Sequence, residues 1–506
     1  MKKTLFVFSV LACLIATAQK KSVQTTYANT ITADALKARL AIVASKEMEG
    51  RETATPGQKR AAAFIESQFK EMGLLPGNNG NYQLKYPVYI DSLVNTSVDI
   101  NGKTYELDKD FSVNVGQSTN CSYRFSEVVF VGNGVSDSTK DDYKGLDVKG
   151  KVVLVLGGQQ PQGGGGFRRG GNFFAKADAA QKNGAIAVLL IGNGFPRQMK
   201  TNPKGNMYVS AFQKMIRLDQ FTISEDMATA IMGADYAAAK SGNIQPKTYT
   251  ANVALNFNKE TTNLESSDVL GVLEGTDLKD EYVFVTGHYD HLGKRGDSVI
   301  YYGADDDGSG TCAVMQIAQA FAKAKADGKG PRRTMVFMTV SGEEKGLWGS
   351  DYYTNHPVFP LEKTTVDLNI DMIGRIDTSR KQGDPNNYVY VVGDDKLSTD
   401  LRTISEDVNK KNGKVELDYK FNDPNDRNRI YFRSDHFNFA RKGVPIIFYY
   451  DGMLGSDYHK PTDTPDKISY DLYAKRAQLV FYTAWDMANR DNMLKRDIPL
   501  ETPRGF

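Results

Sequence analysis

The chain has 506 residues, of which 40% are hydrophobic and 25% are charged, so its composition is that of a globular protein and excludes wholesale disorder and collagen-like architecture. Sixty-three Lys and Arg residues against 61 Asp and Glu residues give a formal charge of +2, which is too balanced for a nucleic-acid binder. Three cysteines in a chain of this length exclude a scaffold built on disulfides.

The first eighteen residues have the pattern of a secretory signal peptide. Lys2 and Lys3 precede the apolar run Leu5 to Ala16, and Ala16-Thr17-Ala18 is an A-x-A cleavage site. The run is too short to span a membrane, and no later segment has the roughly 20 apolar residues that a span requires. Its removal takes the charge from 63 − 61 to 61 − 61, or zero. We therefore expect an exported protein (periplasmic, outer-surface or extracellular), with lipoprotein processing at Cys13 as an alternative.

Residues 30–118 are predicted to form helices followed by short strands. Ile65, Phe69 and Met72 have the spacing of one helix face. Alternating apolar residues between 86 and 115 predict short antiparallel strands. We assign this segment to the N-terminal part of a larger domain that resumes at about residue 260.

A second α/β module is expected over residues 119–255. It contains a strand, a helix, a second strand and a further helix, at Val152–Leu156, Ala175–Asn183, Ala185–Ile191 and after Ser224. The length of the chain allows two to four domains, and this pattern favours two, with the smaller one inserted into the larger.

Continuous apolar or β-branched runs alternate with helical segments between residues 260 and 490. The runs are Tyr282–Thr286, Thr334–Val340, Val366–Ile370, Tyr388–Val392 and Val444–Tyr449. Strands that are buried on both faces of a mostly parallel sheet have this composition. We therefore predict an α/β fold with a mostly parallel sheet flanked by helices, and a smaller inserted α/β domain.

Clusters of histidines and carboxylates follow these strands or open the helix between them. They are His288-Tyr289-Asp290-His291, Asp305-Asp306-Asp307, Glu343-Glu344, Asp371 and Tyr458-His459. A lone acid at such a place often only caps a helix, but ligands of α/β sheets gather where parallel strands end. Five such clusters at one edge indicate bound cations, and imidazole with carboxylate favours zinc, cobalt or manganese over calcium.

The clusters resemble the ligand motifs of the co-catalytic zinc exopeptidases, of the bacterial leucyl aminopeptidase and glutamate carboxypeptidase II type. That family carries its ligands in the order His, Asp, Glu, Asp, His, within H-x-D, G-A-x-D-D-x-S-G, E-E-x-G-L-x-G-S, D-M and H-x-x-x-D-T. The corresponding segments here are His288–Asp290, Gly303–Gly310, Glu343–Ser350, Asp371-Met372 and His459–Thr464. The resemblance covers about residues 30 to 490 and implies a zinc-exopeptidase fold of the phosphorylase/hydrolase-like kind.

The resemblance implies two divalent metal ions, with zinc as the first choice. Asp306 would bridge the two ions. His288 and Asp371 would complete one metal shell, and Glu344 and His459 would complete the other.

It also implies three catalytic roles. Glu343 would be the general base, taking a proton from the water that becomes a metal-bridging hydroxide and delivering it to the leaving amine. The carboxylate of Asp290 would orient His288 and fix its tautomer without binding a metal itself. Tyr458 matches a tyrosine that in some relatives donates a hydrogen bond to the tetrahedral oxyanion.

The second module resembles a protease-associated domain. The resemblance rests on Tyr143-Lys144-Gly145, on Gly150–Leu154 and on the strand–helix pattern of Lys176–Ile191. Such domains are taken to limit access to the active site or to bind part of the substrate. Short peptides are therefore the expected substrates, and no nucleic-acid partner is expected.

The favoured interpretation is a secreted two-metal aminopeptidase, and three alternatives remain. A carboxypeptidase of the same fold would use Arg or Lys for the terminal carboxylate, and Arg295, Arg375 and Arg433 are the candidates. A glutaminyl cyclase would keep a single zinc and lose part of the first ligand set. A receptor-like binding module without catalysis would have lost ligands, whereas all five are present here.

Overall fold

The computed structural model describes residues 22–116, 119–157, 171–212, 216–455 and 457–500, so the predicted signal peptide lies outside the described residues. The chain divides into two compact units, one taking the residues up to Tyr86 and from Ser266 on, and the other taking residues 87–265. Within the described part of the chain, every helix is too short or too polar to cross a membrane.

The first unit is built on a sheet that is mostly parallel, as predicted. Its strands lie in the order β17 (Glu416–Asp418), β16 (Tyr388–Val392), β18 (Ile446–Tyr450), β15 (Thr364–Ile370), β11 (Leu278–His288), β14 (Arg333–Val340) and the end of β10 (Lys247–Leu273). β14, β11, β15 and β18 run parallel to one another, whereas β10 and β16 are antiparallel to their neighbours β14 and β18. The short strand β1 (Leu75–Pro76) adds to β10.

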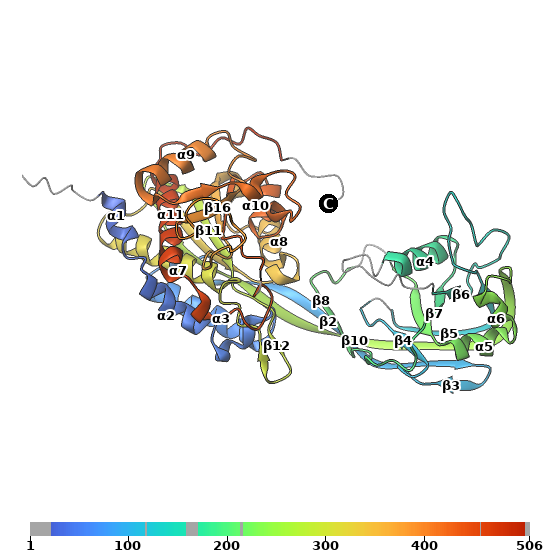
Figure 1. Ribbon diagram of the computed structural model, residues 1–506. Helices are drawn as coiled ribbons and strands as arrows, with labels where there is room; N and C mark the ends of the chain where they lie inside the picture. Colours follow the sequence, from blue (N-terminus) through green and yellow to red (C-terminus); the bar gives the residue numbers. More distant parts are fainter. Residues whose placement is uncertain (1–21, 117–118, 158–170, 213–215, 456, 501–506) are drawn as a thin grey trace, which may run out of the picture. The chain divides into compact units, whose positions relative to one another are not determined.

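Helices cover both faces of this sheet (Figure 1). The helices on one face are α1 (Val23–Ala28), α2 (Ala33–Val43), α3 (Pro56–Glu71), α7 (Gly308–Ala326), α9 (Leu401–Val408) and α11 (Tyr470–Asn489). Those on the other face are α8 (Trp348–Asn355) and α10 (His436–Arg441). Successive residues of β11 enter opposite cores, since Val283 and Val285 pack with α7 while Phe284 packs with α8 and α10. The continuous apolar runs are therefore explained by burial on both faces.

Helix α7 connects the core to the polar edge of the sheet. Asp307 caps its first turn, because Oδ1 accepts a hydrogen bond of 2.7 Å from the main-chain N–H of Gly310. Val314, Ile317 and Phe321 are fully buried along the helix face that the sequence predicted. The capped end of α7 thus holds the Asp305–Asp307 segment next to the strand ends.

In the second unit the strands lie in the order β10, β5 (Cys121–Phe130), β6 (Val152–Leu156), β7 (Ala187–Ile191), β9 (Asp219–Ile223) and β4 (Phe111–Val113), with β10 contributing strand residues to both units. β5, β6, β7 and β9 are parallel. β2 (Gln83–Ile100) pairs with β3 (Lys103–Tyr105) and β8 (Lys204–Tyr208). The helices are α4 (Gly171–Lys182), α5 (Glu225–Met232) and α6 (Asp235–Lys240). A strand over 152–156 and a helix after Ser224 were both predicted.

The contacts group the described residues 87–116 with the second unit, whereas the sequence assigned residues 30–118 to the N-terminal part of the first. Val98 and Ile100 of β2 share a core with Phe111 and Leu255. The segment also contains one strand of 18 residues where short strands were expected. Alternation of apolar residues shows that a segment is a strand, but its partner strand depends on contacts distant in sequence.

Candidate metal centre

Predicted polar clusters lie together because the strands that precede them are parallel neighbours. β11 pairs with β14 on one side and with β15 on the other, and β15 pairs with β18. His288 is the last residue of β11, Glu343 and Glu344 begin a 3-10 helix just after β14, and Asp371 directly follows β15. Since carboxyl ends of parallel strands share one edge, the sheet brings these side chains to one place.

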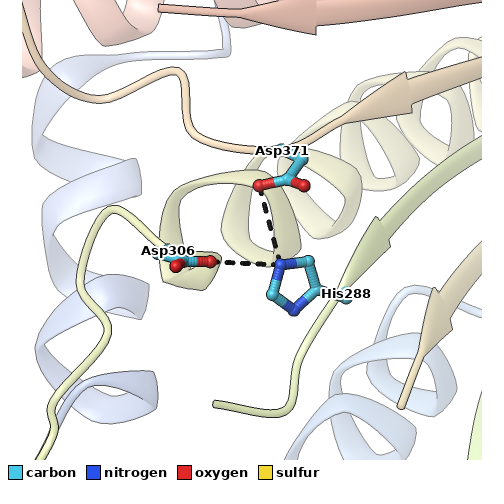
Figure 2. A group of neighbouring side chains, drawn as sticks. All are labelled: His288, Asp306 and Asp371. Carbon is cyan, nitrogen blue, oxygen red and sulfur yellow. Dashed lines mark ion pairs between the residues drawn. The ribbon is translucent and has the colours of Figure 1, made fainter. Parts of the chain in front are cut away.

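Three buried side chains form the first group that could hold a metal ion, namely His288, Asp306 and Asp371. His288 Nε2 lies 3.2 Å from Asp306 Oδ1 and 3.6 Å from Asp371 Oδ1, and Figure 2 shows the three converging. Zinc–ligand distances of about 2.0–2.2 Å in a tetrahedron put neighbouring ligand atoms about 3.3–3.6 Å apart. The spacing therefore fits a zinc ion.

A second group, made up of Asp306, Glu344, His459 and His291, lies on the other side of the Asp306 carboxylate. His459 Nε2 is 3.2 Å from Asp306 Oδ2 and 3.1 Å from Glu344 Oε2. His291, Asp306 and Glu344 are also close enough together to share an ion, with His291 Nδ1 2.8 Å from Glu344 Oε1. Asp306 thus offers Oδ1 to the first group and Oδ2 to the second, which is the arrangement of a bridging carboxylate.

Unpartnered polar atoms and concentrated negative charge show that these residues fit metal ions. His288 Nε2, Asp306 Oδ2 and Glu344 Oε1 are buried without a hydrogen-bond partner in the described part of the chain, whereas buried polar atoms are normally paired. Burial opposes the charge of Asp306, but His288 and His459 outweigh it and hold the pKa of Asp306 well below its usual value. Ionised carboxylates packed this closely require positive partners, and imidazole with carboxylate is a donor set that zinc prefers.

The orientation of His288 is set by Asp290, whose carbonyl oxygen is the nearer group. His288 Nδ1 lies 3.1 Å from that carbonyl oxygen and 3.6 Å from the carboxylate Oδ1 of Asp290. The carboxylate accepts hydrogen bonds from Thr53 Oγ1 at 2.7 Å and from the main-chain N–H of Glu343 at 3.2 Å. A hydrogen on Nδ1 leaves Nε2 as the metal-binding nitrogen. The resemblance assigned this orienting role to the carboxylate of Asp290, whereas the carbonyl oxygen is the group within hydrogen-bond distance.

Glu343 lies beside the first group without being part of it. Its Oε2 is 3.8 Å from His288 Nε2. Burial raises the pKa of Glu343 well above its usual value; His288 opposes the rise, and Asp371 and Glu344 add to it. A carboxylate with a raised pKa holds a proton more readily, as a group that accepts and returns one must.

A pocket opens next to the first group. Asp306, Glu343 and Asp371 form its acidic end. The remaining lining residues are apolar or aromatic apart from one arginine, and they are Met372, Ile430, Arg433, Phe448, Tyr450, Leu454 and Tyr458. The ring of Tyr458 stacks on that of His459, with 3.8 Å between the centroids. Tyr458 is thereby held between the second group and the pocket.

The three arginines that were candidates for binding the terminal carboxylate of a substrate have different environments. Arg433 lines the pocket, and its Nη2 donates a hydrogen bond of 3.0 Å to the hydroxyl of Tyr458. Arg375 Nη2 forms an ion pair of 2.8 Å with Asp457. Arg295 stacks over a tyrosine ring at 5.6 Å. Among these three, Arg433 is the one whose guanidinium faces the pocket.

Arg51 supports the loops that carry the ligands. Its side chain is fully buried and donates hydrogen bonds of 2.7–2.8 Å to four main-chain carbonyl oxygens, those of Val43, Tyr289, Tyr302 and Gly303. Asp463 adds support by accepting hydrogen bonds from the main-chain N–H groups of Asp305 and Asp306 at 3.0 and 3.2 Å. Arg51 and Tyr289 are 238 residues apart, so no local pattern in the sequence predicts the contact.

The structure brings together all the predicted site residues and adds one. The five predicted ligands are His288, Asp306, Glu344, Asp371 and His459, with Glu343, Asp290 and Tyr458 around them. His291 was not given a role by the sequence, although it occurs only three residues after His288 in the same polar segment. That repeated histidine was the signal that could have found it.

Two family profiles match the chain, "Peptidase family M28" over residues 268–484 and "PA domain" over residues 117–214. The aminopeptidase YwaD of Bacillus subtilis is 24% identical over 69% of this chain and 65% of its own length. A probable zinc metalloprotease of Pyrenophora tritici-repentis is 28% identical over 51% of this chain and 59% of its own length. The chain thus spans less than two thirds of the length of these curated relatives.

Solved structures show the same fold. An aminopeptidase from Aneurinibacillus sp. strain AM-1 superposes with a TM-score of 0.54 at 20% identity, covering 95% of this chain and 99% of that one. The zinc aminopeptidase BSAP of Bacillus subtilis gives a TM-score of 0.50 at 19% identity, covering 93% of this chain and 98% of that one. The resemblance to the co-catalytic zinc exopeptidases is confirmed: the chain carries a peptidase family M28 domain together with a PA domain.

Proposed function

We propose that the protein is a zinc aminopeptidase that removes N-terminal residues from short peptides. The observation that carries the proposal is the bridging geometry of Asp306, whose two carboxylate oxygens each lie 3.2 Å from a histidine of a separate metal-binding group. The names of the relatives YwaD and BSAP, an aminopeptidase and a zinc aminopeptidase, agree with this function.

The residues of the chain divide the reaction between them. Bound ions would polarise the scissile carbonyl and lower the pKa of a water molecule. Glu343 would take the proton of the attacking water and pass it to the leaving amine, because its carboxylate lies beside the first group without belonging to it. Tyr458 would donate to the oxyanion, since its oxygen already accepts from Arg433 and its own hydrogen remains available.

The charge of the pocket favours an N-terminal over a C-terminal substrate end. A free ammonium group needs carboxylates, and Asp306, Glu343 and Asp371 supply them at the acidic end. A carboxypeptidase of the same fold would need a cation for the terminal carboxylate, and Arg433 is the residue that it would use. The candidate ligand residues of both groups and Glu343 are all present, which disfavours a one-zinc glutaminyl cyclase and a receptor-like module.

The location and the substrates follow from other parts of the chain. The predicted N-terminal signal peptide supports export to the periplasm, the outer surface or the medium. The PA domain, as a unit that restricts access or binds part of the substrate, supports short peptides as substrates. The balanced charge of the chain disfavours nucleic acid as a partner.

Parallel assays of aminoacyl-nitroanilides and N-blocked peptides test the proposal. The wild-type protein should release nitroaniline from free aminoacyl substrates and leave N-blocked peptides intact. Glu343→Gln serves as the inactive reference in both assays. Cleavage of the blocked peptides alone would replace the aminopeptidase with the carboxypeptidase, and cleavage of neither would favour the non-catalytic module.

A further inference from the structure

We propose that His291 is a ligand of the second metal ion, in addition to Asp306, Glu344 and His459. The inference deepens the zinc centre proposed above and rests on it. It predicts unequal sites, the first with three protein ligands and the second with four.

His291 is fixed deep in the protein beside the second group. Its side chain is 0% exposed, whereas that of His459 is 37% exposed. Its main-chain N–H donates a hydrogen bond of 3.2 Å to the carbonyl oxygen of Arg51. The imidazole packs so tightly against Gly303 that a Cβ at that position would lie 2.5 Å from His291 Cγ. Packing therefore holds the ring in one place, as a ligand requires.

Neither ring nitrogen of His291 has a hydrogen-bond partner among the residues that the structure describes. Nδ1 lies 2.8 Å from Glu344 Oε1 and 3.9 Å from Asp306 Oδ2, and both of these oxygens are also buried without a hydrogen-bond partner. Three electron-pair donors that converge without hydrogen bonds are costly in a protein interior. A hydrogen bond between two of these atoms would leave the third unpaired, whereas one cation bound among them would satisfy all three.

The other buried or structural histidines differ from His291 in this respect. His288, His356 and His436 each have one ring nitrogen within 2.8–3.1 Å of a main-chain carbonyl oxygen. A hydrogen on that nitrogen accounts for their orientation. His291 has no such carbonyl among the described residues, so its orientation is explained by the second group itself.

The ring of His459 is placed so that His291 and His459 could bind the same metal ion. The rings of His291 and His459 are 6.0 Å apart at 70°, and both reach Glu344, one at each carboxylate oxygen. Zinc in proteins takes four ligands in closed sites and keeps a position open in catalytic ones. The second ion is then the more firmly held of the two, and the first, with an open position, is the one that chelators remove first.

Zinc content and X-ray absorption test the assignment on the full-length protein. Fully loaded wild type should contain two zinc ions and three imidazole ligands, whereas His291→Ala should show two imidazoles. The affinity for the more tightly bound ion should fall by more than about 100-fold, beyond the range of changes to outer-shell residues. His356→Ala is the matched control, because it removes an imidazole that is bonded to the carbonyl oxygen of Tyr352 and stacked on the Tyr352 ring.

His291→Asn keeps a polar group of similar reach and serves if His291→Ala does not fold, as judged by circular dichroism and its melting temperature. Two imidazoles in loaded wild type, or an unchanged zinc affinity in both variants, would overturn the assignment while an active two-zinc aminopeptidase still stood. Wild type that binds no zinc would overturn the proposed function and this inference together.

Discussion

Arg433 Nη2 donates a hydrogen bond of 3.0 Å to the phenolic oxygen of Tyr458, and its guanidinium lies 5.9 Å from the centre of the Tyr458 ring. Burial raises the pKa of Tyr458, a rise that Asp306 reinforces and that Arg433 opposes. The hydroxyl therefore stays protonated, and because its oxygen already accepts a hydrogen bond, its hydrogen can be directed into the pocket.

Removing the Tyr458 hydroxyl or the Arg433 side chain should lower kcat much more than it changes KM. We expect Tyr458→Phe to reduce kcat by about 100-fold, the usual effect of removing one oxyanion donor, and Arg433→Ala by about 10-fold, with small changes in KM. A double-mutant cycle measured by steady-state kinetics checks the coupling. If Arg433→Ala costs the same in the Tyr458→Phe background as in wild type, Arg433 does not act through Tyr458.

Glu343→Gln should retain both metal ions and lose at least about 1,000-fold in kcat. The amide keeps the size of the side chain but cannot accept the proton of the attacking water. Metal analysis and progress curves measure the two properties separately. Glu362→Gln, at an exposed position, is the matched control and should have wild-type activity. Near-normal turnover in Glu343→Gln would exclude the residue as the general base.

Chelation should abolish activity and lower thermal stability together. Without ions, the carboxylates of Asp306, Glu343, Glu344 and Asp371 repel one another in a buried space, and the ligand-linked stabilisation is lost. Zinc, cobalt or manganese should restore activity, as measured by nitroanilide hydrolysis after dialysis, while calcium should not. A metal-free protein with full activity would eliminate the metal mechanism.

The sequence predicted the parallel sheet and the five candidate ligand residues that the structure brings together, because both depend on local patterns. The apolar run Thr334–Val340 marks a doubly buried strand, and Glu343-Glu344 follows it directly. The contacts of Arg51 with four carbonyl oxygens could not be predicted in this way, because they join segments up to 252 residues apart. His291 is an intermediate case: its place three residues after His288 could have suggested a role, but its proximity to Glu344 follows only from the pairing of β11 with β14.

His436 should make the stability of the first unit depend on pH. Burial lowers the pKa of His436 to about 3, and its Nε2 lies 2.8 Å from the carbonyl oxygen of Tyr431. An unfolded histidine titrates near pH 6.5, so below that pH the unfolded chain binds a proton that the folded chain does not. The stabilising contribution is therefore complete above about pH 6.5 and is lost as the pH falls toward 3.

His436→Gln should remove this part of the pH dependence, because glutamine keeps a donor for the Tyr431 carbonyl but does not titrate. From pH 7 to pH 5 the wild type should lose about 2 kcal/mol of unfolding free energy through His436, and the variant should lose correspondingly less. Urea unfolding at both pH values, on zinc-free proteins so that metal loss does not contribute, measures the difference. His356→Gln, at an exposed histidine, is the control, and equal losses in wild type and His436→Gln would show that His436 is protonated in the folded protein as readily as in the unfolded chain.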